Sequence, residues 1–198
     1  MKIVELEKQE FIDFCNSNPQ ALFFQSPYWI EIKEQNGWSG KILGVKEDGK
    51  IVIATVILYK SLKGIIKFAY APRGFLMDYK NFDLLTEFTK EIKEYLKKEN
   101  VAFLKINPYV DYQLRDIHGN IIEGTKNDAL MEKLKSLGYK HYGFYVDMDE
   151  KKDLEPRWIS VLDIKGKTID ELFKNFRSGT KWGINNSKKN FITLIEAD

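Results

Sequence analysis

Cysteine and histidine are scarce in this 198-residue sequence, which holds one cysteine and two histidines. A single cysteine excludes a disulfide framework within the chain and favours a reducing compartment. Cys15 lies in the largely apolar run at residues 11–15, so we interpret it as a small buried thiol rather than as a nucleophile. Neither His118 nor His141 stands in a pattern that indicates a catalytic partner for it.

Long apolar runs are also missing. No segment approaches the roughly 20 apolar residues that cross a bilayer, and the N-terminus lacks the apolar stretch of a signal peptide. We therefore expect a cytoplasmic protein, with contact at the inner face of the membrane left open. Neither sign of charge is in large excess, because the chain has 31 basic and 29 acidic residues, for a net charge of +2. This balance is too even to indicate bulk nucleic-acid binding, so we expect any site for a polyanion to be local.

The composition that is present is that of a folded domain. Hydrophobic residues make up 43% and charged residues 30% of the chain, as in globular proteins that bury a core. Alternation of polar and apolar residues predicts strands at 2–6, 40–45, 51–59, 65–71, 101–106 and 139–148. Helical spacing and caps predict helices at 7–16, from Pro27 onward after the N-cap Ser26, at 81–99 and at 127–137.

The last quarter of the chain repeats the order of its beginning. After a charged segment at 150–156 that suits a linker, the pattern predicts a strand at 158–164, helices at 168–176 and 179–189, and a strand at 191–195. This series mirrors residues 2–45 in element order more than in sequence, and coincidence is the alternative. If the repeat is real, residues 1–150 form one domain and 151–198 begin a second, incomplete one. The simplest explanation is a fragment of a longer protein, because a sheet of two strands leaves an unpaired edge.

The element order of residues 1–150 resembles the GNAT acyltransferase fold, an α/β (α+β) architecture in which helices flank a mixed central sheet. GNAT enzymes hold the pyrophosphate of acetyl-CoA on backbone N–H groups of a glycine-rich turn that precedes a helix. The equivalent stretch here, residues 69–79, has one glycine and the bulky run Phe75-Leu76-Met77. We therefore expect that this domain does not bind acetyl-CoA.

Four motifs resemble those of the Fem-type (FemABX) aminoacyltransferases, which build the interpeptide bridges of peptidoglycan. They are Gln25-Ser26-x-x-Trp29-x-x-x-Lys33, then Pro72-Arg73-Gly74 with Asp78-Tyr79, then Phe103-Leu104-Lys105-Ile106-Asn107-Pro108, and last Pro156-Arg157-Trp158 with Leu162-Asp163-Ile164 and Lys181-Trp182. Each motif alone is weak, but together they follow the family's order across nearly the whole chain.

The resemblance implies a fold, substrates and a reaction. It implies two GNAT-like domains and no metal or other cofactor. The donor would be an aminoacyl-tRNA, and the acceptor a peptidoglycan precursor, either UDP-MurNAc-pentapeptide or its lipid-linked form. The stem-peptide amine would attack the tRNA ester, so the enzyme must orient both substrates, accept a proton and stabilise an oxyanion. We expect this fragment to be inactive alone, because the family's catalytic groove uses both domains.

The resemblance also indicates substrate-binding residues in the first domain. Lys33 is similar to the family lysine that pairs with the precursor's diphosphate, and without the motif it would be a solvated lysine. Arg73 is a candidate for a phosphate or carboxylate, the alternative being an arginine that braces its turn through Asp78. Tyr70 and Tyr79 flank this turn and are candidates for lining the precursor groove, with core packing as the alternative.

The general base stays unassigned. Family members often carry aspartate before the proline of the third motif, where this sequence has Asn107. Asparagine cannot act as a general base at neutral pH. Asn107 and the nearby Asp111 are the candidates for a catalytic role.

One segment has a local excess of basic residues. Residues 165–189 hold seven lysines and arginines against two acidic residues. Within it, Arg177, Lys181 and Trp182 are candidates for binding a diphosphate or the tRNA backbone, and a solvated helix face is the alternative. The family usually has arginine at the position of Lys181, so bidentate phosphate binding would be weaker here.

Two other functions stay open. A GNAT-type N-acyltransferase that uses another donor is opposed by the missing phosphate-binding turn. A non-catalytic module that binds cell-wall precursors or a protein partner would show no turnover with charged tRNA.

Overall fold

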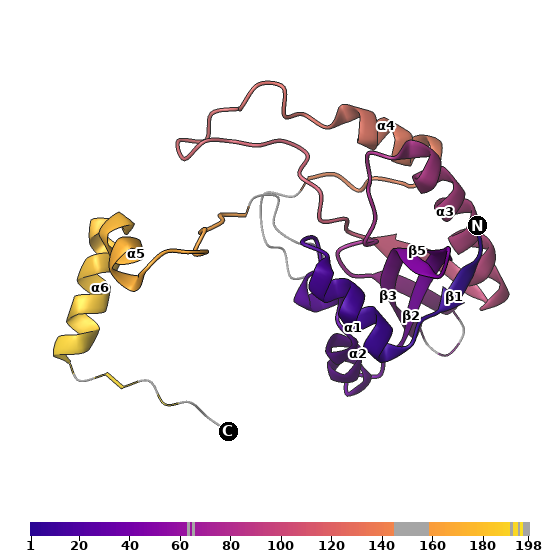
Figure 1. The fold of residues 1–198 in the computed structure, drawn as a ribbon, viewed down its shortest axis with the longest axis horizontal. Coiled ribbons are helices and arrows are strands. Elements are labelled where there is room, and N and C mark those ends of the chain that lie inside the picture. Colours follow the sequence, from indigo (N-terminus) through magenta and orange to yellow (C-terminus); the bar gives the residue numbers. More distant parts are fainter. Residues whose placement is uncertain (63, 65, 145–158, 191, 194, 196–198) are drawn as a thin grey trace. The chain divides into compact units, whose positions relative to one another are not determined.

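The computed structural model describes residues 1–62, 64, 66–144, 159–190, 192–193 and 195 (Figure 1). The chain divides into two compact units, Met1–His141 and Tyr142–Asp198. The linker predicted at 150–156 lies outside the described residues.

A mixed sheet forms the centre of the first unit. In the described residues its strands, in spatial as well as chain order, are β1 (Ile3–Glu5), β2 (Ser39–Glu47), β3 (Lys50–Leu62), β4 (Ile66–Ala71) and β5 (Val101–Ile106). Neighbouring strands are antiparallel, except that β5 lies parallel to β4. A parallel neighbour requires a crossover connection, and helix α3 (Phe82–Lys98) lies in it.

Helices cover both faces of this sheet (Figure 1). Besides α3, the helices of the first unit are α1 (Lys8–Ser17), the 3₁₀ helix η1 (Phe23–Gln25), α2 (Pro27–Glu34) and α4 (Asp128–Ser136). Helices α3 and α4 pack on one face through Leu85, Phe88 and Leu130. Helices α1 and α2 pack on the other face through Phe11 and Ile30. This arrangement confirms the predicted class, a mixed central sheet flanked by helices.

The helices begin where their capping residues place them. The side-chain oxygen of Ser26 accepts the Trp29 N–H at 3.3 Å, and Pro27 follows at the first helical position of α2. The side-chain oxygen of Asn81 accepts the Leu84 N–H at 3.0 Å at the start of α3. Such caps satisfy backbone N–H groups that have no partner inside a helix, which explains why the starts of α2 and α3 follow from the sequence.

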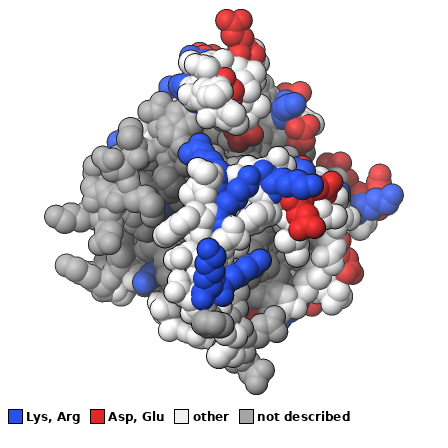
Figure 2. Space-filling model, turned by 90° about the vertical axis from the view of Figure 1, so that its left-hand side faces the viewer, with Lys and Arg blue, Asp and Glu red and all other residues white. Residues whose placement is uncertain are grey.

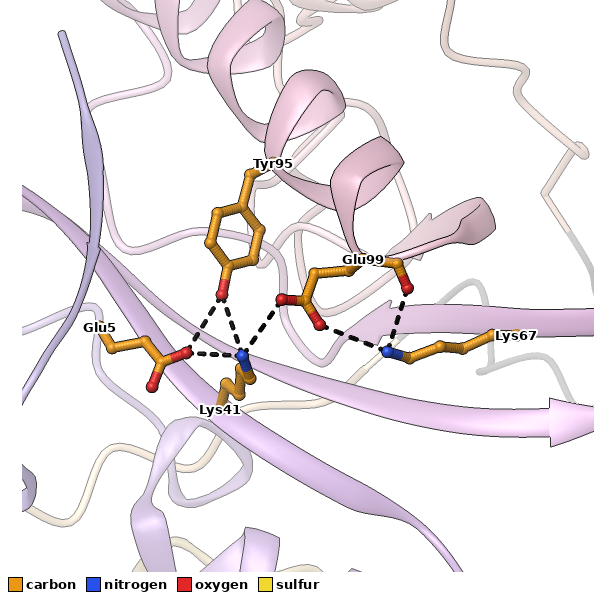
Figure 3. Close-up of polar contacts among 5 residues, drawn as sticks. All are labelled: Glu5, Lys41, Lys67, Tyr95 and Glu99. Carbon is orange, nitrogen blue, oxygen red and sulfur yellow. Dashed lines mark hydrogen bonds and ion pairs between the residues drawn. The ribbon is translucent and has the colours of Figure 1, made fainter.

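A network of charged side chains ties the C-terminal end of α3 to the sheet (Figure 3). Lys41 of β2 places its ammonium 2.6 Å from Glu5 of β1 and 3.3 Å from Glu99, the residue that caps α3. The Tyr95 hydroxyl donates to Glu5 at 3.3 Å, and Lys67 of β4 donates to the Glu99 backbone oxygen at 3.2 Å. The hydrogen bond from Lys41 lowers the pKa of the Glu5 carboxyl. The network therefore joins β1, β2, β4 and α3 at the end where β4 begins.

Three predicted strands are not found in the described residues. Residues 139–144 form no strand, and the rest of the predicted 139–148 segment lies outside the described residues. Residues 159–164 likewise have no regular structure, and neither do 192, 193 and 195 from the segment predicted at 191–195. Alternation reports only that a segment fits a half-buried strand, whereas a strand also needs a neighbour that accepts its hydrogen bonds. These segments have no such neighbour among the described residues.

The second unit contains the two helices that its sequence predicts. They are α5 (Ile169–Asn175) and α6 (Ser178–Lys189). Helix α5 begins with a capping box in which Thr168 and Glu171 each accept the other's backbone N–H, at 3.3 and 2.8 Å. None of the described residues from 142 onward is buried. Across the described parts of both units, no helix has the length and apolar character that crossing a membrane requires.

Candidate functional site

The turn that follows β4 has a backbone that few residues can adopt. Arg73 and Gly74 both lie in the left-handed region, with φ of 59° and 72°. A Cβ on Gly74 would meet the Tyr79 hydroxyl at 2.5 Å and Pro108 Cα at 2.8 Å. Glycine at position 74 is therefore required both by the backbone angle and by the close approach of Pro108.

Side chains from two other elements hold the Arg73 backbone. The Asn107 side-chain oxygen, at the end of β5, accepts the Arg73 N–H at 2.8 Å. The Arg73 carbonyl accepts the Tyr109 N–H at 3.2 Å. The buried side-chain amide of Gln25, in η1, donates toward the carbonyls of Arg73 and Gly74 at 3.4 and 3.3 Å. Asn107 was proposed from the sequence for a catalytic role. In the structure its side-chain oxygen accepts a hydrogen bond from the backbone of Arg73.

Tyr79 lies behind this turn, in the core. It is 6% exposed, and its hydroxyl accepts the Phe75 N–H at 2.8 Å. Burial raises the pKa of the Tyr79 phenol, so it stays protonated at physiological pH. Tyr79 therefore stabilises the turn from the core side, through its hydrogen bond with the Phe75 backbone.

The structure brings Lys33 and Arg73 to the same group of aromatic rings. The Arg73 guanidinium lies 5.0 Å from the ring centre of Phe24 and 5.8 Å from that of Tyr109. The Phe24 ring meets the Trp29 ring edge-on, with the ring centres 5.0 Å apart. The Lys33 ammonium, one helical turn after Trp29, lies 4.7 Å from the centre of the Trp29 ring. Aromatic faces attract cations, so Phe24 and Trp29 connect two basic side chains 40 residues apart in the sequence.

A second group of aromatic rings lies on the face of β4 and β5 that is turned away from α3. The Phe68 ring stacks on Phe103 with ring centres 5.3 Å apart and meets Trp38 edge-on at 5.4 Å. Phe103 is 51% exposed. The Lys60 ammonium lies over the Trp38 ring, and the Lys105 ammonium lies over the Tyr70 ring. We call this surface the open aromatic face; it is made of Trp38, Lys60, Phe68, Tyr70, Phe103 and Lys105. Flat aromatic surfaces flanked by lysines suit a ligand that has both a planar ring and negative charge.

Tyr70 joins this open aromatic face through its position in the sheet. It is the partner of Lys105 in the β4–β5 register, and the Lys105 ammonium lies 5.4 Å from its ring centre. Asp111, the other residue proposed for catalysis, is exposed in the chain after β5. Tyr70 therefore lies on the surface that faces away from α3, and Asp111 is placed by no described hydrogen bond.

The residues proposed in the second unit lie on α6 and at its start. Arg177 is the exposed N-cap of α6, and Trp182 is 69% exposed. The Lys181 ammonium donates to the Lys174 carbonyl at 2.8 Å, which satisfies the C-terminal end of α5. Figure 2 shows one face of the molecule, on which lysine, arginine and acidic side chains are all exposed.

Cys15 is unsuited to nucleophilic chemistry. The side chain is half-buried, and this burial raises the pKa of the thiol to about 11. The thiolate is the reactive form, so Cys15 is almost wholly unreactive at neutral pH. In the parts of the chain that the structure describes, acidic, histidine and cysteine side chains form no cluster that suits a metal ion.

Sequence reasoning missed most of the open aromatic face. A signal was present, because Phe68 and Tyr70 in one predicted strand, and Phe103 and Lys105 in another, are spaced two apart and must share a face. That Trp38 joins them depends on strand order, which spacing within a strand does not encode. The bond between Asn107 and Arg73 links residues 34 positions apart, and no local pattern reports it.

Comparisons by sequence and by structure both identify Fem proteins as similar to this chain. A family model described as "FemAB family" matches residues 6–197. Aminoacyltransferase FemA from Staphylococcus aureus strains RF122 / ET3-1 and MW2 is 34% identical over 195 residues, which is 98% of this chain and 46% of each relative. The crystal structure of FemX superimposes with a TM-score of 0.79 at 29% identity, over 100% of this chain and 46% of that one. The chain thus spans about half the length of these relatives.

Proposed function

The chain belongs to the FemAB family, and from this membership we propose that it is the precursor-binding part of an aminoacyltransferase. The whole enzyme transfers an amino acid from aminoacyl-tRNA to the stem-peptide amine of a peptidoglycan precursor, UDP-MurNAc-pentapeptide or its lipid-linked form. This forms part of an interpeptide bridge. The activity belongs to the cytoplasm, where charged tRNA is available, at or near the inner face of the membrane.

The observation that carries the proposal is the placement of Lys33 and Arg73 around Phe24 and Trp29. The ammonium lies over Trp29 and the guanidinium over Phe24, and these two rings pack edge-on, so in this proposal the two cations bind negative charges of one ligand. Charge-assisted hydrogen bonds to phosphate oxygens are about twice as strong as neutral ones. The diphosphate of the precursor, which joins its nucleoside to its sugar, carries the negative charge that two such cations would bind.

The open aromatic face supplies a second part of the acceptor site in this proposal. The exposed ring of Phe103, stacked on Phe68, offers a flat surface on which the uracil base of the precursor can stack. Lys60 and Lys105, over the rings of Trp38 and Tyr70, add positive charge beside it. A nucleoside diphosphate has a planar base for the open aromatic face and negatively charged phosphates for Lys33 and Arg73.

The turn after β4 argues against acetyl-CoA as the donor. Four consecutive N–H groups, from Arg73 to Leu76, donate within the protein: to the Asn107 side chain, the Ala71 carbonyl, the Tyr79 hydroxyl and the Ala54 carbonyl. A GNAT enzyme needs such groups for the pyrophosphate of its cofactor. With these donors occupied, a charged tRNA is the donor that agrees with the family.

In the proposed reaction, the nitrogen of the stem-peptide amine bonds to the ester carbonyl carbon of the aminoacyl-tRNA. The bond from that carbon to the ribose oxygen breaks, the amine loses a proton, and the ribose oxygen gains one. Asn107 cannot take this proton. In the proposal this chain therefore binds and orients the acceptor, while Asp111 is the carboxylate nearest in sequence for the proton transfer.

The second unit belongs to the same proposal as the start of a second GNAT-like domain, from residue 151 to 198. Ile159, Val161, Leu162 and Ile164 lie in a segment without regular structure and are between 58% and 79% exposed, and a completed second domain would bury such apolar side chains. The basic residues of α6, with Arg177, Lys181 and Trp182, are proposed to contact the diphosphate or the tRNA backbone. Such contacts weaken steeply with rising salt.

Calorimetric titration with UDP-MurNAc-pentapeptide tests the acceptor site. We expect Lys33→Ala to weaken binding by about ten- to a hundredfold, because it removes a charge-assisted contact. Lys90→Ala is the matched control, since Lys90 lies exposed on α3 and its loss changes the net charge equally. Unchanged affinity in Lys33→Ala would contradict the assigned site. Failure of both this chain and the full-length protein to bind would overturn the peptidoglycan assignment.

A further inference from the structure

Arg73 is held in a backbone conformation that its residue type avoids. Among the described residues other than glycine, Asp48, Arg73 and Asn100 have a positive φ. Aspartate and asparagine tolerate the left-handed region because their short side chains bond locally, whereas arginine has no such advantage. A strained residue of this kind persists only where its surroundings fix it, and such residues concentrate at functional sites.

The surroundings fix both peptide groups of Arg73. Asn107 accepts its N–H at 2.8 Å, from the end of β5. The Tyr109 N–H and the Gln25 side chain donate to its carbonyl at 3.2 and 3.4 Å. The Gln25 side-chain oxygen also faces the Leu22 N–H, at 3.4 Å, at the start of η1. The backbone of Arg73 is therefore joined to η1 and to the segment after β5.

The same bonds place the two rings that support the guanidinium. Phe24 lies next to Gln25 in η1, and Tyr109 lies two residues after Asn107. Their ring centres are 5.0 and 5.8 Å from the guanidinium carbon. One set of hydrogen bonds thus positions Arg73 and the rings of Phe24 and Tyr109. Within this set, the Asn107 side chain is the acceptor described for the Arg73 N–H.

We propose that Asn107 is a positioning residue, which orients the Arg73 guanidinium toward an anionic group of the acceptor by holding the Arg73 backbone. The assignment rests on the proposed function, in which Arg73 contacts the precursor. An asparagine and an aspartate each offer one side-chain oxygen to the N–H, so the positioning role is independent of a carboxylate. This role differs from that of a base, which asparagine cannot perform.

Binding and side-chain mobility together test this role in four variants: Asn107→Ala, Asn107→Asp, Arg73→Ala and the double variant of Asn107→Ala with Arg73→Ala. With UDP-MurNAc-pentapeptide as the probe, we expect Asn107→Ala to bind about three- to tenfold more weakly, because a mobile arginine must be ordered on binding. Asn107→Asp should bind within about twofold of the unaltered chain, since its oxygen accepts the same bond. The double variant should bind no more weakly than Arg73→Ala alone, because Asn107 acts through Arg73.

A measurement without ligand separates this proposal from the proposed function. The heteronuclear NOE of the Arg73 Nε–H group reports side-chain motion on the picosecond to nanosecond scale. We expect a rigid signal in the unaltered chain and in Asn107→Asp, and a mobile one in Asn107→Ala, with the other amide signals unmoved as evidence of folding. A rigid Arg73 in folded Asn107→Ala, or additive losses in the double variant, would overturn the positioning role. If the unaltered chain binds no precursor while the NOE pattern holds, the proposed acceptor fails and the positioning of Arg73 stands.

Discussion

Gly74 and Gly49 have nearly the same backbone conformation and very different surroundings. Their φ angles are 72° and 77°. A Cβ on Gly74 would meet Pro108 Cα at 2.8 Å, whereas a Cβ on Gly49 would meet nothing within 4 Å. The pair therefore separates the cost of a left-handed backbone from the cost of a tight contact.

We predict that Gly49→Ala lowers the free energy of unfolding by about 1 kcal/mol, the backbone cost alone. Gly74→Ala should lower it by about 2 to 4 kcal/mol, because overpacking against the backbone adds to that cost. Urea denaturation of both variants measures the difference. Equal losses would mean that the turn relaxes freely and that Pro108 does not confine it.

The candidate residues were predictable from the sequence to different degrees. Lys33 and Arg73 stand in motifs, and the structure brings both to the aromatic pair Phe24 and Trp29. The contact made by Asn107 was not predictable, because it depends on β5 ending beside the turn after β4. A motif indicates which side chain matters, but its partner is set by the packing of distant elements.

At the scale of elements, α3 is joined to the sheet by its apolar face and by the network around Lys41. The core contacts of Leu85 and Phe88 are fully buried. The side chains of Lys41, Glu5 and Glu99 are 34%, 58% and 30% exposed. Partly exposed ion pairs contribute far less than a buried aromatic ring, so the network adjusts the stability of this junction rather than creating it.

We predict that Lys41→Met lowers the free energy of unfolding at pH 7 by about 1 kcal/mol or less. Since Lys41 holds the pKa of Glu5 below its ordinary value of 4.5, this contribution is complete above that value and disappears as the pH falls through the folded-state pKa. In thermal unfolding, the difference between the variant and the unaltered chain should therefore be full at pH 7 and shrink as the pH is lowered below 4.5. Lys90→Met is the control, and a difference in stability that does not shrink on acidification would assign the effect to packing of the lysine stem.

Elements with strong local signals were predicted well, and elements that depend on partners were not. Helix α3, expected at 81–99, spans Phe82–Lys98, because its apolar spacing and its Asn81 cap both lie in the local sequence. The segment at 159–164 has apolar residues typical of a strand but no described partner, and it has no regular structure. A helix satisfies its own backbone, whereas a strand requires another strand.

The two units differ in how much apolar core their described residues bury. Among the described residues, the two hydrophobic clusters lie in residues 1–141. From residue 142 onward, none of the described residues is buried, and α5 and α6 are 7 and 12 residues long. Isolated helices of this length are marginal in water, so the second unit has no described source of stability of its own.

We predict that a fragment ending at His141 unfolds cooperatively in urea, with a midpoint close to that of the whole chain. A fragment of residues 142–198 should show little helix by circular dichroism and no cooperative transition, because none of its described residues is buried. A sharp transition in the second fragment would contradict this prediction. It would also argue that the fragment forms a core through self-association, which its concentration dependence would reveal.

The half-buried Cys15 makes the molecule convenient for site-specific labelling. Burial raises the pKa of the Cys15 thiol to about 11, so the thiol is almost entirely protonated at pH 7. A cysteine introduced on an exposed loop, for example by His118→Cys, would ionise near pH 8.5 and react with a maleimide some hundredfold faster. A fluorescent or spin probe can therefore be attached at a chosen position without first replacing the native cysteine.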